Sequence, residues 1–365
     1  MVRGIKKLSD WYFRNERWLS SFGLVGGFLF DIFTLTRVDE TLENIWVGFH
    51  LIIAAVGIIF INLYEEGKLK AKVPGRAHFW WAFVIQFAFG GLFSVYLVFY
   101  SRSASFFASW PFLLILLINF LANERLRERY ARTDFQITML FLGTLFYFIY
   151  IIPIILGEIS TIVFLLSGVV SLIFMAIFVY ILAVVTPKRL WSEKWILIGS
   201  VIGSYLLINV LYFTHLIPPI PLSLKEATVT HHVSKNAGYS YTLLEEVNDK
   251  PWYQYFLRSE TIHLVSGSPA YVYTAIFAPA RINTPIVHKW QYYDASSKKW
   301  IDSSVIPLSI KGGREEGFRT FSYKSNLKPG RWRVSVDTAT GQTIGRLVFL
   351  IEPATYNPIL KEVTK

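Results

Sequence analysis

Five ionisable residues fall within or beside long apolar stretches of the sequence: Asp31, His50, Arg102, Glu158 and His215. A charged group in hydrocarbon is costly and usually acquires a partner, so such residues mark either structural ion pairs or proton and ion pathways. On the spans given below, Asp31 and His50 lie at matching depth, about 8 to 9 Å inside the outer boundary. We therefore expect a polar cluster near the outer helix ends, serving as a structural ion pair or as a functional site.

Two rows of alternating residues in the C-terminal part each share one face of an expected strand. Flat aromatic rings stack on the apolar faces of sugars, and an Arg or His beside them donates the hydrogen bonds that fix orientation. The same side chains could instead fill the interior, which is the more frequent place for large apolar residues on alternating strands. The rows are His288, Trp290 and Tyr292, and Arg319, Phe321 and Tyr323.

The sequence offers little for metal or nucleophilic chemistry. It has no cysteine, which excludes thiolate ligands and disulfides, and no Gly-x-Ser-x-Gly elbow. His231 and His232 are adjacent and would point to opposite faces of a strand, and His263 and His288 stand isolated along the chain. We expect no catalytic residues, no metal site and no cofactor, so a non-enzymatic role is favoured.

The composition points to a membrane protein. Of the 365 residues, 53% are apolar and 17% are charged, below the roughly 25% charge of an ordinary soluble domain. The net charge of +11 divides almost evenly, with 18 basic against 13 acidic residues up to Pro218 and 18 against 12 beyond it. A purely soluble protein is excluded, and nucleic acid is not an expected partner.

Seven apolar runs approach the roughly 20 residues that a helix needs to cross the hydrocarbon layer. Clusters of charge separate them. The predicted spans are Trp18 to Thr36, Asn44 to Tyr64, His78 to Tyr100, Ser103 to Asn123, Thr133 to Leu156, Ile159 to Val185 and Lys194 to Pro218.

Basic residues in alternate loops predict the orientation of these spans. They cluster in the N-terminal segment and in residues 68–76, 125–132 and 188–194, whereas the intervening connections carry only Arg37 and Arg102. Because cytoplasmic loops are rich in Lys and Arg, the N-terminus is expected inside and the tail beyond the seventh span outside. The predicted location is a multi-pass position in the cytoplasmic membrane, in contact with lipid.

Pro218, Pro219 and Pro221 end the last helix and mark a domain boundary between residues 1–218 and 219–365. Beyond it, short runs rich in β-branched and aromatic residues alternate with turn residues, which is typical of an all-β fold. This count and length predict an immunoglobulin-like sandwich, with the segment Tyr239 to Leu257 left ambiguous. The expected strands are Glu226 to Ser234, Glu260 to Val265, Ala270 to Phe277, Ile286 to Tyr293, Trp300 to Ile310, Phe318 to Tyr323, Arg331 to Asp337 and Thr343 to Ile351.

Several short motifs occur in order between Thr261 and Glu352: His288-Lys289-Trp290, Gly317-Phe318-Arg319-Thr320, Gly330-Arg331-Trp332-Arg333-Val334, Gly341-Gln342 and Gly345-Arg346 with Phe349. This run resembles the bacterial family catalogued as domain of unknown function 2914. The resemblance implies a module that often follows transmembrane helices. It implies no reaction or ligand, because none is established for the family.

Together these features predict a seven-helix membrane bundle that presents an extracytoplasmic β-sandwich to the cell envelope. The sandwich is expected to act as a binding or accessory module for a glycan or another protein. The alternative is a membrane-embedded transporter or enzyme whose site lies at the outer helix ends, with the sandwich as a lid. A sensor is less consistent with cytoplasmic loops this short.

Overall fold

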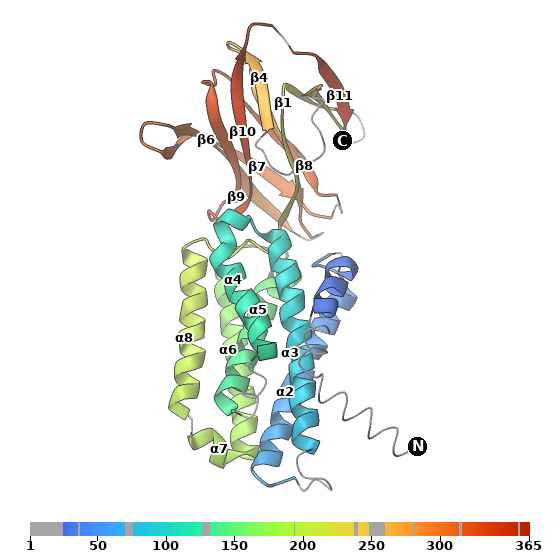
Figure 1. Cartoon of the computed structure of the whole chain (residues 1–365), viewed down its shortest axis with the longest axis vertical. Helices are drawn as coiled ribbons and strands as arrows, with labels where there is room; N and C mark the ends of the chain where they lie inside the picture. Colours follow the sequence, from blue (N-terminus) through green and yellow to red (C-terminus); the bar gives the residue numbers. More distant parts are fainter. Residues whose placement is uncertain are drawn as a thin grey trace. The chain divides into compact units, whose positions relative to one another are not determined.

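The computed structural model describes residues 25–35, 37–69, 76–125, 132–192, 194–236, 240–247, 260–279, 282–313, 316–356 and 358–365. The chain divides into two compact units (Figure 1). The helical unit comprises Met1–Arg102, Trp110–Pro153 and Ile162–Leu216. The β unit comprises Ser103–Ser109, Ile154–Thr161 and Ile217–Lys365.

The helices follow the apolar runs of the sequence. Among the described residues, five helices are long and apolar enough to cross a membrane: α2 (Thr41–Glu65), α3 (Arg76–Ser103), α5 (Thr133–Leu156), α6 (Thr161–Val185) and α8 (Lys194–Phe213). The segments Val25–Thr34 and Ala108–Asn123 are shorter apolar helices. Five of the seven predicted spans therefore have helices of sufficient length, and part of the first predicted span lies outside the described residues. The helices are Val25–Thr34, α2 Thr41–Glu65, α3 Arg76–Ser103, α4 Phe106–Arg125, α5 Thr133–Leu156, α6 Thr161–Val185, α7 Pro187–Ser192 and α8 Lys194–Phe213.

Burial distinguishes central from peripheral helices. In the most apolar stretch of α5, 67% of the residues are buried, against 22% in α8. Large apolar side chains such as Ile202 and Leu206 are exposed on α8. Exposed apolar surface of this extent is what lipid contact requires, so the helical unit is that of a multi-pass membrane protein.

Buried polar side chains join two of these helices. The Asn62 amide on α2 donates to Gln136 Oε1 on α5 at 2.6 Å, and Thr133 Oγ1 donates to Asn62 Oδ1 at 3.1 Å. All three residues are at most 1% exposed. Each polar group satisfies another, which is the condition for placing them inside an apolar bundle.

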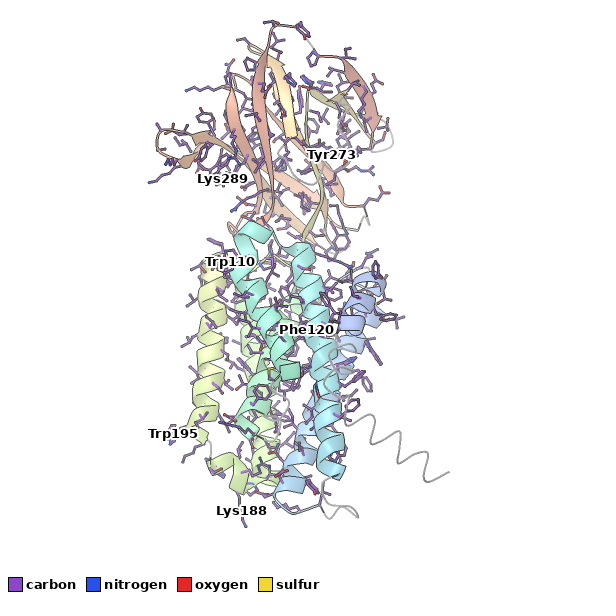
Figure 2. The ribbon with its side chains drawn as sticks, viewed as in Figure 1. Trp110, Phe120, Lys188, Trp195, Tyr273 and Lys289 are labelled. Atoms are coloured by element: carbon purple, nitrogen blue, oxygen red, sulfur yellow. The ribbon has the colours of Figure 1, made fainter. Side chains whose placement is uncertain are left out.

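One end of the helical unit gathers charges from two loops that were both expected to be cytoplasmic. Lys68 Nζ donates to the carbonyl of Val185 at 2.7 Å, and Glu66 accepts the backbone N–H of Lys188 at 2.7 Å. Lys188 and Trp195 lie at this end of the bundle and Trp110 at the other (Figure 2). The contacts place the two basic loops on the same side, and the tryptophans near both ends fit interfacial positions.

The β unit contains eleven strands among its described residues. Most coincide with the predicted ones, but the expected strand Glu226 to Ser234 is interrupted at His231, the ambiguous segment contains β3, and β11 was not predicted. The strands are β1 Ser223–Thr230, β2 His232–Lys235, β3 Tyr241–Glu246, β4 Glu260–Val265, β5 Ala270–Phe277, β6 Asn283–Asp294, β7 Lys299–Lys311, β8 Phe318–Lys324, β9 Gly330–Thr338, β10 Thr343–Ala354 and β11 Leu360–Thr364.

These strands form three sheets with the orders β1-β5-β8, β4-β10-β9-β6-β7 and β11-β3-β2. Neighbouring strands are antiparallel except that β10 pairs with β4 in parallel. We call β1-β5-β8 sheet A, β11-β3-β2 sheet B, and the five-stranded β4-β10-β9-β6-β7 sheet C.

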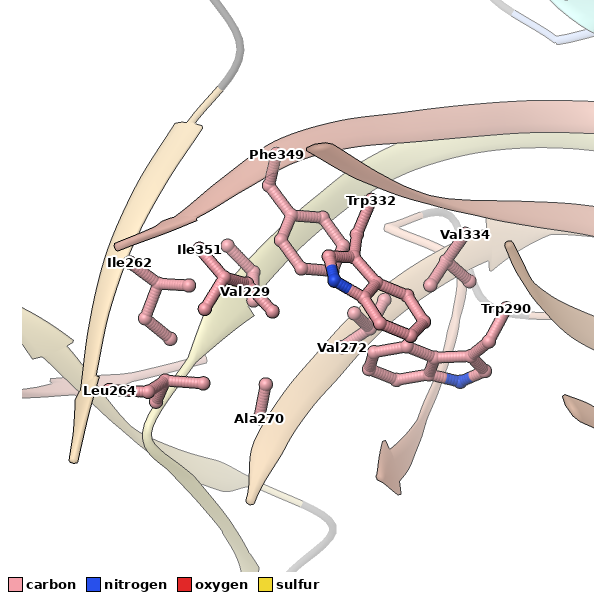
Figure 3. Packing of buried hydrophobic residues seen from close by; sticks show 10 residues of the cluster. All are labelled: Val229, Ile262, Leu264, Ala270, Val272, Trp290, Trp332, Val334, Phe349 and Ile351. Atoms are coloured by element: carbon pink, nitrogen blue, oxygen red, sulfur yellow. The ribbon is translucent and has the colours of Figure 1, made fainter. Parts of the chain in front are cut away.

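The main core of the β unit lies between sheets A and C. Val272 of sheet A packs in one cluster with Trp290, Trp332 and Phe349 of sheet C, and all four are at most 3% exposed (Figure 3). A second cluster places Leu243 of sheet B with Tyr273 of sheet A. Sheet A therefore has an inner face toward sheet C and an outer face that sheet B covers in part.

Candidate functional site

The row on β6 faces the interior of the β unit. His288 and Trp290 are fully buried, and Tyr292 is half-buried with its ring 5.3 Å from that of Trp332. The recognition surface proposed below therefore leaves out His288 and Trp290, since an external ligand does not reach them in this conformation.

A chain of hydrogen bonds fixes the His288 ring. Trp290 Nε1 donates to Ser322 Oγ at 3.0 Å, and this hydroxyl lies 2.9 Å from His288 Nδ1. His288 Nε2 lies 3.1 Å from Thr274 Oγ1. Burial lowers the pKa of His288 to about 4. The imidazole is therefore neutral at pH 7, with Ser322 donating to Nδ1 and Nε2–H donating to Thr274.

The row on β8 lies on the opposite face of sheet A. Ser322 points to the core, so its alternating neighbours Arg319, Phe321 and Tyr323 share the outer face. The Arg319 guanidinium forms an ion pair with Glu316, and the Arg319 carbonyl accepts a hydrogen bond from Tyr241 at 3.1 Å. Both described contacts of Arg319 are therefore made within the β unit.

The aromatic members of this row continue onto β5 and β2. The Tyr323 ring stacks on Tyr271 with centroids 5.3 Å apart, and Tyr271 also contacts Phe321 at 6.1 Å and His232 at 5.1 Å. Tyr323 is 58% exposed, whereas Phe321 is partly covered by Tyr241. We call Tyr323, Tyr271, Phe321 and His232 the aromatic platform.

Two platform residues were missed by the sequence reasoning. Tyr271 lies directly opposite Tyr323 in the β5–β8 register. Alternation on the predicted strand Ala270 to Phe277 could have placed Tyr271 on the same face as Tyr273, but its pairing with β8 is a long-range property. The position of His232 on the platform could not be predicted, because the expected first strand is interrupted at His231 and a separate strand, β2, begins at His232.

In the helical unit, Asp31, His50 and Arg102 lie around the end of helix Val25–Thr34. Ser94 Oγ on α3 donates to the Asp31 carboxylate, and the His50 side chain interacts with this carboxylate electrostatically. Arg102 donates to the backbone carbonyls of Ile32 and Leu35, the former at 2.8 Å. Arg102 therefore caps the helix that carries Asp31, where a cation also meets the negative end of the helix dipole.

His50 is held in one orientation. It is 5% exposed, and its Nδ1 lies 2.9 Å from the Trp46 carbonyl, to which it donates. A Cβ atom at Gly91 of α3 would lie 2.9 Å from His50 Nε2, so only glycine leaves room for the ring. With Nδ1 donating, Nε2 is the hydrogen-bond acceptor of the neutral ring.

The other two residues of the predicted polar cluster have different surroundings. Glu158 is exposed and belongs to the β unit. His215 is exposed and has a φ of 58° just beyond the end of α8, where a left-handed residue ends a helix. The contacts described here link Asp31 with His50 and place Arg102 at the end of the helix that carries Asp31.

His263, which stands isolated along the chain, has acidic partners in the folded β unit. Its Nδ1 lies 2.8 Å from Glu246 Oε2, and His231 Nε2 lies 2.8 Å from Glu246 Oε1. Glu352 approaches His263 Nε2 at 3.3 Å. The hydrogen bonds from His231 and His263 outweigh the effect of burial and lower the pKa of Glu246 to about 2. The ionised Glu246 on β3 therefore ties sheet B to the end of β1 and to β4.

This His–Glu arrangement resembles a metal site only in its residue types. Within the described part of the chain, no group of three or more His, Asp or Glu side chains is arranged to hold a metal ion.

Comparison with solved structures gives only weak similarities. The β-glucosidase from Listeria innocua in complex with glucose matches 32% of this chain and 16% of its own at 17% identity, with a TM-score of 0.19. The Pseudomonas fluorescens alkylpurine DNA glycosylase AlkC bound to DNA matches 87% of this chain and 99% of its own at 10% identity, with a TM-score of 0.22. The chain spans about a sixth of the glucosidase, and TM-scores this low carry no argument about fold or function.

No curated protein matches the chain. A family model matches the segment from β6 into β10, which contains most of the sequence motifs named above. Residues 283–351 match the model of the family described as protein of unknown function (DUF2914).

Proposed function

We propose that this chain is a bacterial cytoplasmic membrane protein with two domains, residues 1–218 and 219–365, and that the second is an extracytoplasmic recognition module. The alternation of basic and poorly basic loops supports the orientation. The shared end of Lys68 and Lys188 supports the same-side placement of two basic loops.

The proposed fold of the module is an immunoglobulin-like sandwich. The order β10-β9-β6-β7 corresponds to strands G-F-C-C′ of a variable-type domain, and β1-β5-β8 corresponds to A-B-E. Trp290 on the strand equivalent to C is buried in the core, as in that fold. Sheet B is an addition to this plan.

The proposed ligand of the module is an envelope glycan that stacks on the aromatic platform. The observation that carries this proposal is the 58% exposure of Tyr323 together with its stacking on Tyr271. The exposed Tyr323 ring and the half-buried Tyr271 ring beside it form a flat aromatic surface that the apolar face of a sugar ring would cover. His232 beside Tyr271 supplies a hydrogen-bonding group at the platform edge.

The test is binding of the full-length protein in maltoside-free detergent to soluble N-acetylglucosamine oligosaccharides and to insoluble peptidoglycan. We expect Tyr323→Ala and Tyr271→Ala to weaken binding about fivefold each, since aromatic contacts are worth about 1 kcal/mol. The matched control is Tyr356→Ala, because Tyr356 is 78% exposed and lies outside the platform. Equal losses in all three variants, or no binding by the wild type, would remove the glycan proposal and leave a protein partner to be tested.

A second candidate is a membrane-embedded transporter or enzyme with its site at the outer helix ends. The contact of the Asp31 carboxylate with Ser94 and its interaction with His50 favour it. The test is proton flux into proteoliposomes that contain a pH-sensitive dye. Flux in the wild type that is absent in Asp31→Asn would support this function, and equal leakage in both would reject it.

A further inference from the structure

The outer face of sheet C, opposite the core, carries a ring of charged side chains around Ser335. Arg346 on β10 and Lys289 on β6 each lie directly opposite Ser335 in the strand register. Arg333 and Asp337 lie two residues before and after Ser335 on β9, so all four share its face. Side chains directly opposite one another have Cβ atoms about 5 Å apart, which allows the three long cations to converge over the small serine.

Electrostatic interactions show that the members of this ring are close together. The Asp337 carboxyl interacts with Arg346, Lys289 and Arg333, and Arg333 interacts with Arg346. Burial and the neighbouring Arg346 lower the pKa of Arg333. Burial raises the pKa of Asp337, which is 8% exposed and has no hydrogen-bond partner described for Oδ1. The positive charges of Arg333 and Arg346 therefore repel each other, and burial disfavours the charged form of Asp337, the acidic member of the ring.

Neighbouring groups hold the cations in place. Arg333 Nε donates to Gln291 Oε1 at 2.5 Å, and its guanidinium lies 4.4 Å from the ring centre of Trp300. Lys289 forms an ion pair with Asp302 at 2.8 Å. Arg346 is exposed. Arg333 is therefore oriented before any ligand arrives, which reduces the entropy that binding costs.

We propose that the ring of Arg333, Arg346 and Lys289 over Ser335 binds a phosphate group. Three cationic side chains on one face around Ser335 match a group with three terminal oxygens and more than one negative charge, whereas a carboxylate offers two oxygens and one charge. The phosphate would relieve the repulsion between Arg333 and Arg346. This site lies on sheet C and the aromatic platform lies on the outer face of sheet A. A failure of the phosphate proposal would therefore leave the glycan proposal unaffected, and the reverse also holds.

The experiment is phosphorus NMR of inorganic phosphate and of glycerol 3-phosphate, each titrated with the full chain in phosphate-free detergent micelles. We expect line broadening by the wild type and a loss of affinity of about tenfold in Arg346→Gln, with weakening at higher salt. Broadening of both probes indicates a general phosphate site, and broadening of glycerol 3-phosphate alone indicates a site for a phosphomonoester. Either result supports the proposal.

Two variants and a competitor make the test decisive. Lys361→Gln removes one exposed positive charge on β11, outside the ring, and should leave affinity unchanged. Arg333→Gln should match or exceed the loss in Arg346→Gln, and a folding defect in the former leaves the exposed Arg346 variant to decide. Absence of broadening, equal effects of Lys361→Gln and Arg346→Gln, or equal competition by succinate at the same ionic strength would overturn the phosphate assignment.

Discussion

The helical unit and the β unit place the same kinds of side chain in opposite environments. In the helical unit, Ile162 and Leu206 are exposed while Asn62 is fully buried. In the β unit, Trp290 is fully buried and the exposed faces carry charges and tyrosines. The extensive exposed apolar surface of the first unit is therefore the kind that lipid contact requires, whereas the exposed Tyr323 of the second unit is a candidate for ligand binding.

Both units nevertheless use buried polar contacts to join elements that are distant in sequence. Asn62 and Gln136 connect two helices, and His288 and Ser322 connect sheets C and A. The difference lies in the surrounding apolar packing. Large aromatic residues surround the His288–Ser322 hydrogen bond in the β unit. Substitutions there should therefore destabilise the fold mainly through lost packing, whereas substitutions at Asn62 or Gln136 should destabilise it mainly through a lost hydrogen bond.

The largest expected effect is therefore in the core of the β unit. Trp290→Ala removes a fully buried indole and should lower the free energy of unfolding by about 3 to 5 kcal/mol. Denaturant unfolding followed by circular dichroism in the sheet region measures it. Trp195→Ala is the control, because Trp195 is 75% exposed, and its effect should stay below about 0.5 kcal/mol. Similar effects for the two would contradict the comparison.

Acid should destabilise the β unit through His288. The folded-state pKa of about 4 lies below the ordinary value of 6.5, so the unfolded chain binds the proton more tightly. Stability is then complete above about pH 6.5 and falls by about 3 kcal/mol as the pH drops to about 4. The measurement is the difference between the stability-versus-pH curves of the wild type and His288→Gln. Parallel curves over this window would show that His288 does not titrate in this way.

A smaller effect is expected for the polar bridge of the helical unit. Asn62→Ala and Gln136→Ala should each cost about 1 to 2 kcal/mol in detergent thermal stability. Their coupling in a double-mutant cycle should be about 0.6 to 1.7 kcal/mol. Asn209 bonds only the carbonyl of Tyr205 on its own helix, among the contacts described for it, so Asn209→Ala with Gln136→Ala is the matched control and should be additive. Additivity in both cycles would mean that Asn62 and Gln136 act independently.

The smallest effect is expected between Asp31 and His50, which interact without a hydrogen bond described between them. Alanine at either position should lower detergent thermal stability, and the double variant should cost less than the sum, by about 0.5 kcal/mol. Asp31→Ala combined with Asn209→Ala provides the uncoupled reference. A cycle no different from this reference would leave the two residues unlinked.

The sequence predicted the elements better than their partners. Hydrophobic run length and period locate α5 and β5 to the residue, because both signals are local. The interruption at His231 and strand β11 carry weaker patterns, since short edge segments contain few apolar residues. The added sheet B depends on pairing between β3 and β11, which are separated by more than a hundred residues and share no local signal.

The candidate site shows the same limit. Alternation placed Arg319, Phe321 and Tyr323 on one face, but it could not tell which face of β8 meets the core. The hydrogen bond that Ser322 Oγ accepts from Trp290 Nε1 of sheet C shows that the Ser322 face of β8 meets the core. The contribution of Tyr271, and the ring around Ser335, both depend on strand register and so required the structure.

We propose that the β unit lies on the extracytoplasmic side of the membrane and the loop at Lys188 on the cytoplasmic side. The chain has no cysteine, so a single introduced one is a unique label. Tyr356 and Lys188 are both exposed, which makes Tyr356→Cys and Lys188→Cys suitable variants. In cells with an intact cytoplasmic membrane, a membrane-impermeant maleimide should label the Tyr356→Cys protein and should label the Lys188→Cys protein only after permeabilisation. The reverse pattern, or labelling of both before permeabilisation, would contradict the proposed topology.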